Sequence, residues 1–136
     1  MRRERKDVTD TELAVLRLLW DEGPSTIRRL TDRLYPRGST AHYATVQKLL
    51  ERLEAKRCAR RRQQGRVNVY SAAVDREQLI AHRLRETADK LCGGSLTPLL
   101  TQLVSSKPLS REEIAALREL VGELERSDDE SRGGDG

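Results

Sequence analysis

Three helix-like stretches are followed directly by a short stretch of alternating residues, and only a few folds accommodate this order. Apolar residues first recur at spacings of three and four, the pattern of amphipathic helices. The spacing then changes to two around Gln64-Gly65, which fits a tight turn between two strands. The expected elements are a helix opening at Thr9, helices over 26–34 and about 39–56, and strands over 58–63 and 66–71. This order predicts a winged helix-turn-helix, with three helices and a β-hairpin wing.

The ends of the first helices are marked by capping residues and helix breakers. Thr9 and Glu12 have the spacing of a capping box, and Gly23-Pro24 should end the first helix. Ser25 is the expected N-cap of the second helix, which residues 35–38 then break. These signals place each of the first two helices independently of its apolar pattern.

The second half of the chain predicts three further helices. Their expected start and stop signals are Asp75 with Gln78, Gly93-Gly94, Thr97, and a second capping box over Ser110–Glu113. The middle helix is expected over residues 95–105. From Ser127 onward apolar residues are absent, so the tail is expected to be disordered. The fold class is therefore mainly α.

Charge divides the chain into a basic front and an acidic rear. Residues 1–74 contain 17 Lys and Arg against 9 Asp and Glu, whereas residues 75–136 contain 9 against 13. We expect a winged-helix DNA-binding domain over 1–74, a helical dimerisation domain over 75–126, and a disordered tail over 127–136. The basic half is suited to a polyanion, and the acidic half is repelled by one.

The basic run KRCARRRQQGRVNVY, residues 56–70, spans the end of the third helix and both strands of the wing. A recognition helix enters the major groove with its N-terminal residues nearest the bases, and wing cations lie near phosphates. The expected DNA-binding residues are His42, Tyr43, Ala44, Thr45, Gln47, Lys48, Arg52, Arg60, Arg61, Arg62 and Arg66. Alternatively, His42 and Tyr43 pack at the helix start, Thr45 is a capping or core hydroxyl, and half of the wing arginines only solubilise an edge.

The rear helices carry more apolar surface than such short elements can cover alone, so a second copy of the chain is the expected partner. The expected dimerisation residues are Leu84, Leu91, Leu99, Leu103, Ile114, Leu117, Leu120, Val121 and Leu124. The alternative is that these helices fold back on the winged helix of the same chain, which would then be a monomer.

Several classes of function are disfavoured. One Trp, three Tyr and no Phe offer little stacking surface for unpaired bases, so double-stranded DNA is preferred over single-stranded RNA. His42 and His82 are isolated, and phosphate loops and nucleophile elbows are absent, so we expect no enzyme, cofactor or metal. The apolar stretches are too short for membrane insertion, and no signal-peptide core follows the N-terminus. Cys58 and Cys92 are expected to be reduced thiols. A cytoplasmic protein is expected.

The chain resembles the penicillinase-repressor family, which includes methicillin-resistance and copper-transport repressors. The resemblance covers about residues 7–125 and is most specific in Tyr43-Ala44-Thr45-Val46, in Gly65-Arg66 and in Val69-Tyr70-Ser71. It implies a homodimeric transcriptional repressor that binds a palindromic operator through its N-terminal winged helix. It also implies that Thr45, Gln47 and Lys48 face DNA and that Arg66 lies in the wing.

Two departures from the family concern the wing turn and copper. The family commonly has Lys-Gly after the recognition helix, whereas this chain has Lys56-Arg57, so a different turn into the wing is expected. Cys92 alone does not replace the clustered cysteines of the copper branch. In the penicillinase branch, repression is relieved by proteolysis in the dimerisation helices, which would add a membrane-bound sensor protease as a partner. The nearest counterpart of the cleaved bond is Gln102-Leu103.

A different class of function is a winged-helix module that binds an acidic protein and no specific DNA sequence. Such a module should present an apolar anchor on the recognition helix, where this chain offers only Tyr43. The exposed polar residues of that helix therefore distinguish the two hypotheses.

Overall fold

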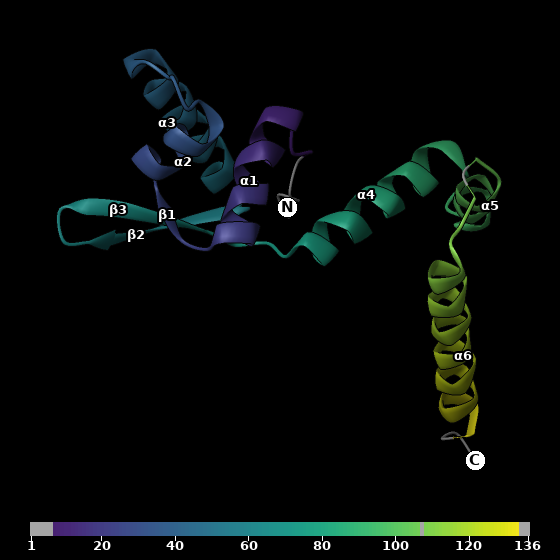
Figure 1. Cartoon of the computed structure of the whole chain (residues 1–136). Helices are drawn as coiled ribbons and strands as arrows, with labels where there is room; N and C mark the ends of the chain where they lie inside the picture. Colours follow the sequence, from purple (N-terminus) through teal and green to yellow (C-terminus); the bar gives the residue numbers. More distant parts are fainter. Residues whose placement is uncertain (1–6, 107, 134–136) are drawn as a thin grey trace. The chain divides into compact units, whose positions relative to one another are not determined.

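The computed structural model describes residues 7–106 and 108–133 (Figure 1). The chain divides into two compact units at Glu86/Thr87. The division falls inside a helix, whereas the sequence predicted a domain boundary after residue 74.

The first unit is the winged helix-turn-helix expected from the sequence. Its elements are α1 (Asp10–Glu22), β1 (Ser25–Thr26), α2 (Ile27–Leu34), α3 (Thr40–Ala55), β2 (Ala59–Gln64), β3 (Val67–Ala72) and the start of α4 (Arg76–Leu91). The capping box at Thr9 is confirmed, because its hydroxyl accepts from the Glu12 N–H at 3.2 Å while Glu12 accepts from the Thr9 N–H at 2.9 Å. The β2–β3 hairpin extends away from the helices (Figure 1).

The sheet contains a third strand that the sequence did not predict. Its order is β1-β3-β2, with Ser25 opposite Tyr70 and Arg61 opposite Tyr70 on the other side. Ser25 is therefore a strand residue and not the expected N-cap of α2, which is Thr26. A two-residue strand is too short to show an alternating pattern, so only the pairing with β3 identifies it.

The hairpin turn lies one residue further along the chain than expected. Gln64 pairs with Val67, so the two loop residues are Gly65 and Arg66. Gly65 has a φ of 65° at the first loop position, where primed hairpin turns require a positive φ. The turn thus places Arg66 at the tip of the wing.

One apolar core joins the three helices to the base of the sheet. The buried residues are Val8, Val15, Leu16, Leu19, Ile27, Leu30, Val46, Leu49, Leu50, Leu53, Cys58, Ala59, Tyr70, Val74 and Leu79. Trp20 packs at its edge and donates its indole N–H to the Val74 carbonyl at 2.8 Å. The N-terminal part of α4 belongs to this unit through Leu79 and through an ion pair of Arg76 with Asp21 at 2.9 Å.

Lys56 and Arg57, where the family commonly has Lys-Gly, form the turn that ends α3. The Cys58 N–H donates to the Leu53 carbonyl at 2.8 Å and the Arg57 N–H donates to the Glu54 carbonyl at 2.9 Å, which is a Schellman motif. Arg57 has a φ of 62°, the left-handed conformation that glycine usually supplies. The two hydrogen bonds and buried Cys58 hold arginine in the conformation that glycine adopts freely.

Replacing Arg57 by glycine should raise the free energy of unfolding by about 0.5–1 kcal/mol, since relief of left-handed strain exceeds the added chain entropy. The measurement is urea unfolding of each variant at one protein concentration. Arg37→Gly removes the same charge at a residue without positive φ and should be neutral or destabilising. Equal stability changes in the two variants would contradict strain at Arg57.

The second unit contains the end of α4 with α5 (Thr97–Ser106) and α6 (Arg111–Gly133). The second capping box is confirmed, with Ser110 and Glu113 exchanging hydrogen bonds of 3.1 and 3.0 Å. Thr97 is the first residue of α5 and not its cap, because its N–H donates to the Ser95 hydroxyl at 3.3 Å.

The prediction that residues 127–136 are disordered is wrong for residues 127–133. Helix α6 continues to Gly133, so residues 127–133 are helical and not disordered; residues 134–136 lie outside the described residues. Asp128 and Arg132 form an i,i+4 ion pair of 3.6 Å on this turn. A helix already nucleated at Ser110 extends at low cost through polar residues, which apolar content alone does not reveal.

Candidate nucleic-acid interface

Helix α3 presents a polar face opposite its core stripe. Val46, Leu49, Leu50 and Leu53 are buried, which leaves the other side of the helix to solvent. Ala44, Thr45, Gln47, Lys48 and Arg52 are all exposed there, as expected from the sequence. Among residues 7–106, the side chains of Gln47, Lys48 and Arg52 have no hydrogen-bond or ion-pair partner. They are therefore available to base edges or phosphates.

Two of the predicted contact residues already have roles inside the protein. His42 is half-buried, accepts the Ser39 N–H at Nδ1 over 3.0 Å and stacks on Tyr35 with ring centroids 4.3 Å apart. The Thr45 hydroxyl donates to the Ala41 carbonyl at 3.0 Å, one turn earlier in α3. His42 thus fits the alternative of packing and capping at the helix start, whereas Thr45 still exposes its methyl group.

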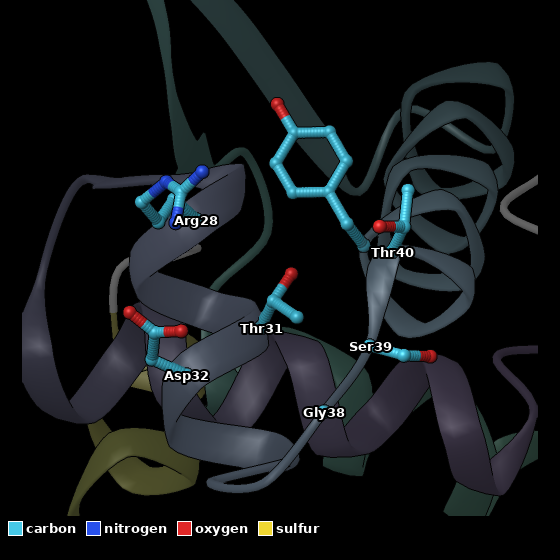
Figure 2. A pocket seen from close by; sticks show the side chains of 7 residues that line it. Arg28, Thr31, Asp32, Gly38, Ser39 and Thr40 are labelled. Atoms are coloured by element: carbon cyan, nitrogen blue, oxygen red, sulfur yellow. The ribbon is translucent and has the colours of Figure 1, made fainter.

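An open groove lies where the N-terminal end of α3 meets α2 (Figure 2). Its volume is about 370 Å³ and its lining residues are Arg28, Thr31, Asp32, Gly38, Ser39, Thr40 and Tyr43. Gly38 is required at its floor, because an added Cβ would lie 2.9 Å from the Tyr35 carbonyl oxygen. The groove has a guanidinium, hydroxyl groups and a helix N-terminus, a combination suited to an anionic oxygen, although Asp32 opposes it.

Arg28 was not predicted as a contact residue. Its neighbours Arg29 and Arg33 both pair with Glu22, at 3.3 and 2.8 Å, which offsets part of their charge and occupies both guanidinium groups. The hydrogen bond from Arg33 is the main cause that lowers the pKa of the Glu22 carboxyl; burial opposes it, and the hydrogen bond from Arg29 adds to the lowering. In the sequence, Arg28 is distinguished only by its position directly before Arg29. That position identifies Arg28 as an available cation only once Glu22 is known to pair with Arg29.

The wing arginines point to both faces of the hairpin. Arg61 lies opposite buried Tyr70 and approaches Glu54 of α3 at 3.8 Å, so it is on the face towards the helix. Burial and the nearby Glu54 raise the pKa of the Tyr70 hydroxyl, and Arg61 partly offsets this. Arg60 and Arg62 lie on the other face, opposite Ser71 and Val69, and are exposed. Arg60, Arg62 and the tip residue Arg66 are the wing cations most available to a phosphate.

The second unit leaves most of its predicted dimerisation residues exposed. Within residues 87–106 and 108–133, the exposed fraction is 80% for Leu91, 55% for Leu103, 54% for Leu120 and 70% for Leu124. Ile114 and Val121 are also exposed, as is Leu84 in the first unit, whereas Leu99 and Leu117 are half-buried. Large apolar side chains exposed in this number are typical of interaction surfaces.

The Gln102-Leu103 bond lies within α5, and both residues are exposed. Proteases bind their substrates in extended form, so cleavage at this bond requires α5 to unwind locally. Among the described residues, no helix combines the length and apolar character that a membrane crossing requires.

Comparison with known proteins identifies a family over nearly the whole chain. The family model described as "Penicillinase repressor" matches residues 8–123. The penicillinase repressor of Bacillus licheniformis is 26% identical over 116 residues, which cover 85% of this chain and 90% of that protein. An uncharacterized 16.5 kDa protein of Latilactobacillus sakei is 26% identical over 121 residues, covering 89% of this chain and 82% of that protein. Among solved structures, the E41A mutant of Lactococcus lactis ZitR is similar with a TM-score of 0.44 and 19% identity, over 90% of this chain and 76% of that one.

Proposed function

Since the chain belongs to the penicillinase repressor family of transcriptional repressors, we propose that it acts as a homodimer on a palindromic operator. The observation that carries this proposal is the exposed polar face of α3 beside a wing with Arg66 at its tip, where Gln47 and Lys48 have no side-chain partner among the residues that the structure describes. A helix of this kind fits the major groove, and a basic hairpin of this kind fits the adjacent backbone.

The proposed roles of the contact residues differ. Gln47 and Lys48 read base edges, since Gln pairs with adenine and Lys reaches the acceptors of guanine. Thr45 packs its methyl on thymine, and Ala44 and Tyr43 lie at the same helix surface. Arg52, Arg60, Arg62 and Arg66 bind phosphates, and Arg28 joins them from α2. Arg61 acts mainly inside the wing, through Glu54.

Repression then follows by exclusion: the dimer occupies a site that overlaps a promoter, and polymerase cannot use it. Each winged helix binds one half-site weakly, and dimerisation presents the second half-site at high effective concentration. An inducing signal that separates the protomers therefore releases the operator. Cleavage of Gln102-Leu103 by a membrane-bound sensor protease is one such route, and an uncut chain after incubation with a cognate protease would remove it.

The proposal is tested by selecting bound sequences from a random duplex pool and then titrating the selected site at several salt concentrations. A site with two-fold symmetry is expected, and the logarithmic affinity should fall with a slope of about −5 if roughly six phosphates are neutralised per dimer. An unselective pool with a flat salt response would instead support a protein-binding module.

Substitutions should separate base reading from backbone binding. Gln47→Ala should change the preferred base at one position of each half-site, whereas Arg62→Ala should weaken all sequences and reduce the salt slope by about 1 per chain. Arg61→Ala is the matched control, because it removes an arginine from the adjacent strand position on the opposite face. Anisotropy titrations measure both effects. Equal losses for Arg61 and Arg62 would contradict the assigned faces of the wing.

A further inference from the structure

Three metal-ligating side chains converge beside the start of α1, although the sequence offered no metal motif. One ligand atom from each of Asp7, His82 and Glu86 lies within 4.8 Å of the other two. We propose that these residues form a binding site for a divalent first-row transition ion of the Zn²⁺ type. The site lies wholly within the first unit.

The two helical ligands share one face of α4. His82 and Glu86 are four residues apart, and the imidazole Nε2 lies 3.5 Å from a Glu86 carboxylate oxygen. Both side chains are half-buried and already restricted, so binding an ion costs them less side-chain entropy. A His and a carboxylate at this spacing present an N and an O donor side by side.

The third ligand is held in place by its backbone. The Asp7 carbonyl accepts a hydrogen bond from Lys56 Nζ at 2.9 Å, and the next carbonyl, of Val8, accepts from Arg83 Nη2 at 2.6 Å. The Val8 side chain is itself buried in the core. These contacts place the Asp7 carboxylate beside α4, so a bound ion would require little movement of the chain.

The donor set selects the class of ion. One imidazole and two carboxylates suit Zn²⁺ and its neighbours, whose N and O ligands lie at about 2.0–2.2 Å, and an imidazole is a poor ligand for Ca²⁺ or Mg²⁺. The 4.8 Å limit exceeds the separations in such a site, so the side chains must close slightly around the ion. The nearby cations Lys56 and Arg83 lower its affinity, whereas the two carboxylates raise it.

A bound ion would link the segment before α1 to α4 and so stabilise the first unit. No metal was expected from the sequence because His82 is isolated there from other ligating residues, and only the packing of α4 against the N-terminal segment brings Asp7 to it. The site does not depend on the proposed operator binding, so each can fail without the other.

The test is isothermal titration of the full chain with Zn²⁺, paired with Co²⁺ absorption and thermal unfolding. Wild type should bind one ion per chain with a raised Tm, and bound Co²⁺ should show d–d bands without thiolate charge transfer. Asp7→Asn and His82→Gln should lose this binding while circular dichroism shows them folded. His42→Gln, which alters the other histidine, and Cys92→Ser should bind as wild type.

Unchanged binding in both Asp7→Asn and His82→Gln would overturn the proposal, as would a thiolate band that disappears in Cys92→Ser. Absence of binding by the wild-type chain would also overturn it. Loss of binding in the two ligand variants alone, with the Tm increase lost in parallel, would support it.

Discussion

A chain carrying Leu120→Glu and Leu124→Glu is expected to be monomeric and to bind its operator about 100-fold more weakly, at the lower end of the usual gain from linked binding. Both leucines lie on α6 and are more than half exposed, at 54% and 70%. If a second chain covers them, each glutamate places an unpaired charge in an apolar interface, which is strongly unfavourable. Sedimentation equilibrium measures the association, and anisotropy measures operator binding.

The matched control is Arg118→Glu with Arg126→Glu. It introduces the same two glutamates on α6, at exposed positions that are already polar. Because the free energy of burying apolar surface is unchanged there, the control should remain a dimer. A dimer that survives the leucine substitutions would refute α6 as the interface. Dissociation of both variants alike would mean that net charge, and not the apolar face, controls assembly.

Lys56→Met is expected to reduce the free energy of unfolding by about 3 kcal/mol, because it leaves a buried charge without its partner. Lys56 pairs with Glu12, whose side chain is 1% exposed, and it also donates to the Asp7 carbonyl. Among the described residues, Glu12 Oε2 is the buried side-chain atom without a hydrogen-bond partner, so after loss of Lys56 the Thr9 N–H at Oε1 is the remaining donor to this carboxylate. The double variant Glu12→Met with Lys56→Met removes both charges and should recover part of the loss.

The pH dependence of stability provides a second measurement of the Glu12–Lys56 pair. Burial opposes ionisation of Glu12, but hydrogen bonds from Lys56 and Thr9 and the charge of Lys56 outweigh it, so the pKa of Glu12 lies below 4.5. A lowered pKa contributes stability above pH 4.5 that is lost as pH falls through the folded value. In Lys56→Met only the hydrogen bonds with Thr9 still oppose burial, so the pKa of Glu12 should rise and stability should fall less on acidification than in the wild type. Urea unfolding at several pH values measures this, and parallel profiles would contradict the pair.

Much of the fold could be predicted because its signals are local. The capping boxes at Thr9 and Ser110 specify where α1 and α6 begin, and the core stripe of α3 specifies which side of that helix is exposed. The structure confirms the winged helix-turn-helix, and the family model that matches residues 8–123 confirms the repressor family. The errors at Ser25, Thr97 and the hairpin turn each concern one or two residues at the end of an element. There, the exact boundary depends on strand pairing or on the hydrogen bonds of the preceding turn.

The candidate interface could be predicted in outline but not by residue. Gln47 and Lys48 are exposed as expected, whereas His42 is engaged by Ser39 and Tyr35. Which wing arginine faces α3 depends on the register of β2 against β3, since a shift of one residue exchanges the two faces. Arg28 became a candidate only when Glu22 was found beside Arg29 and Arg33.

The amino-acid sequence by itself determined the order of the helices, the position of the wing and the division of charge, because periodicity, capping and composition act over a few residues. Tertiary structure alone decided the β1 pairing, the left-handed Arg57, the Glu12–Lys56 pair and the approach of Asp7 to His82 and Glu86. Three of these four features join residues more than 40 positions apart. Arg57 is the exception, and there the buried Cys58 and the hydrogen bonds that close α3 outweigh the local preference of arginine.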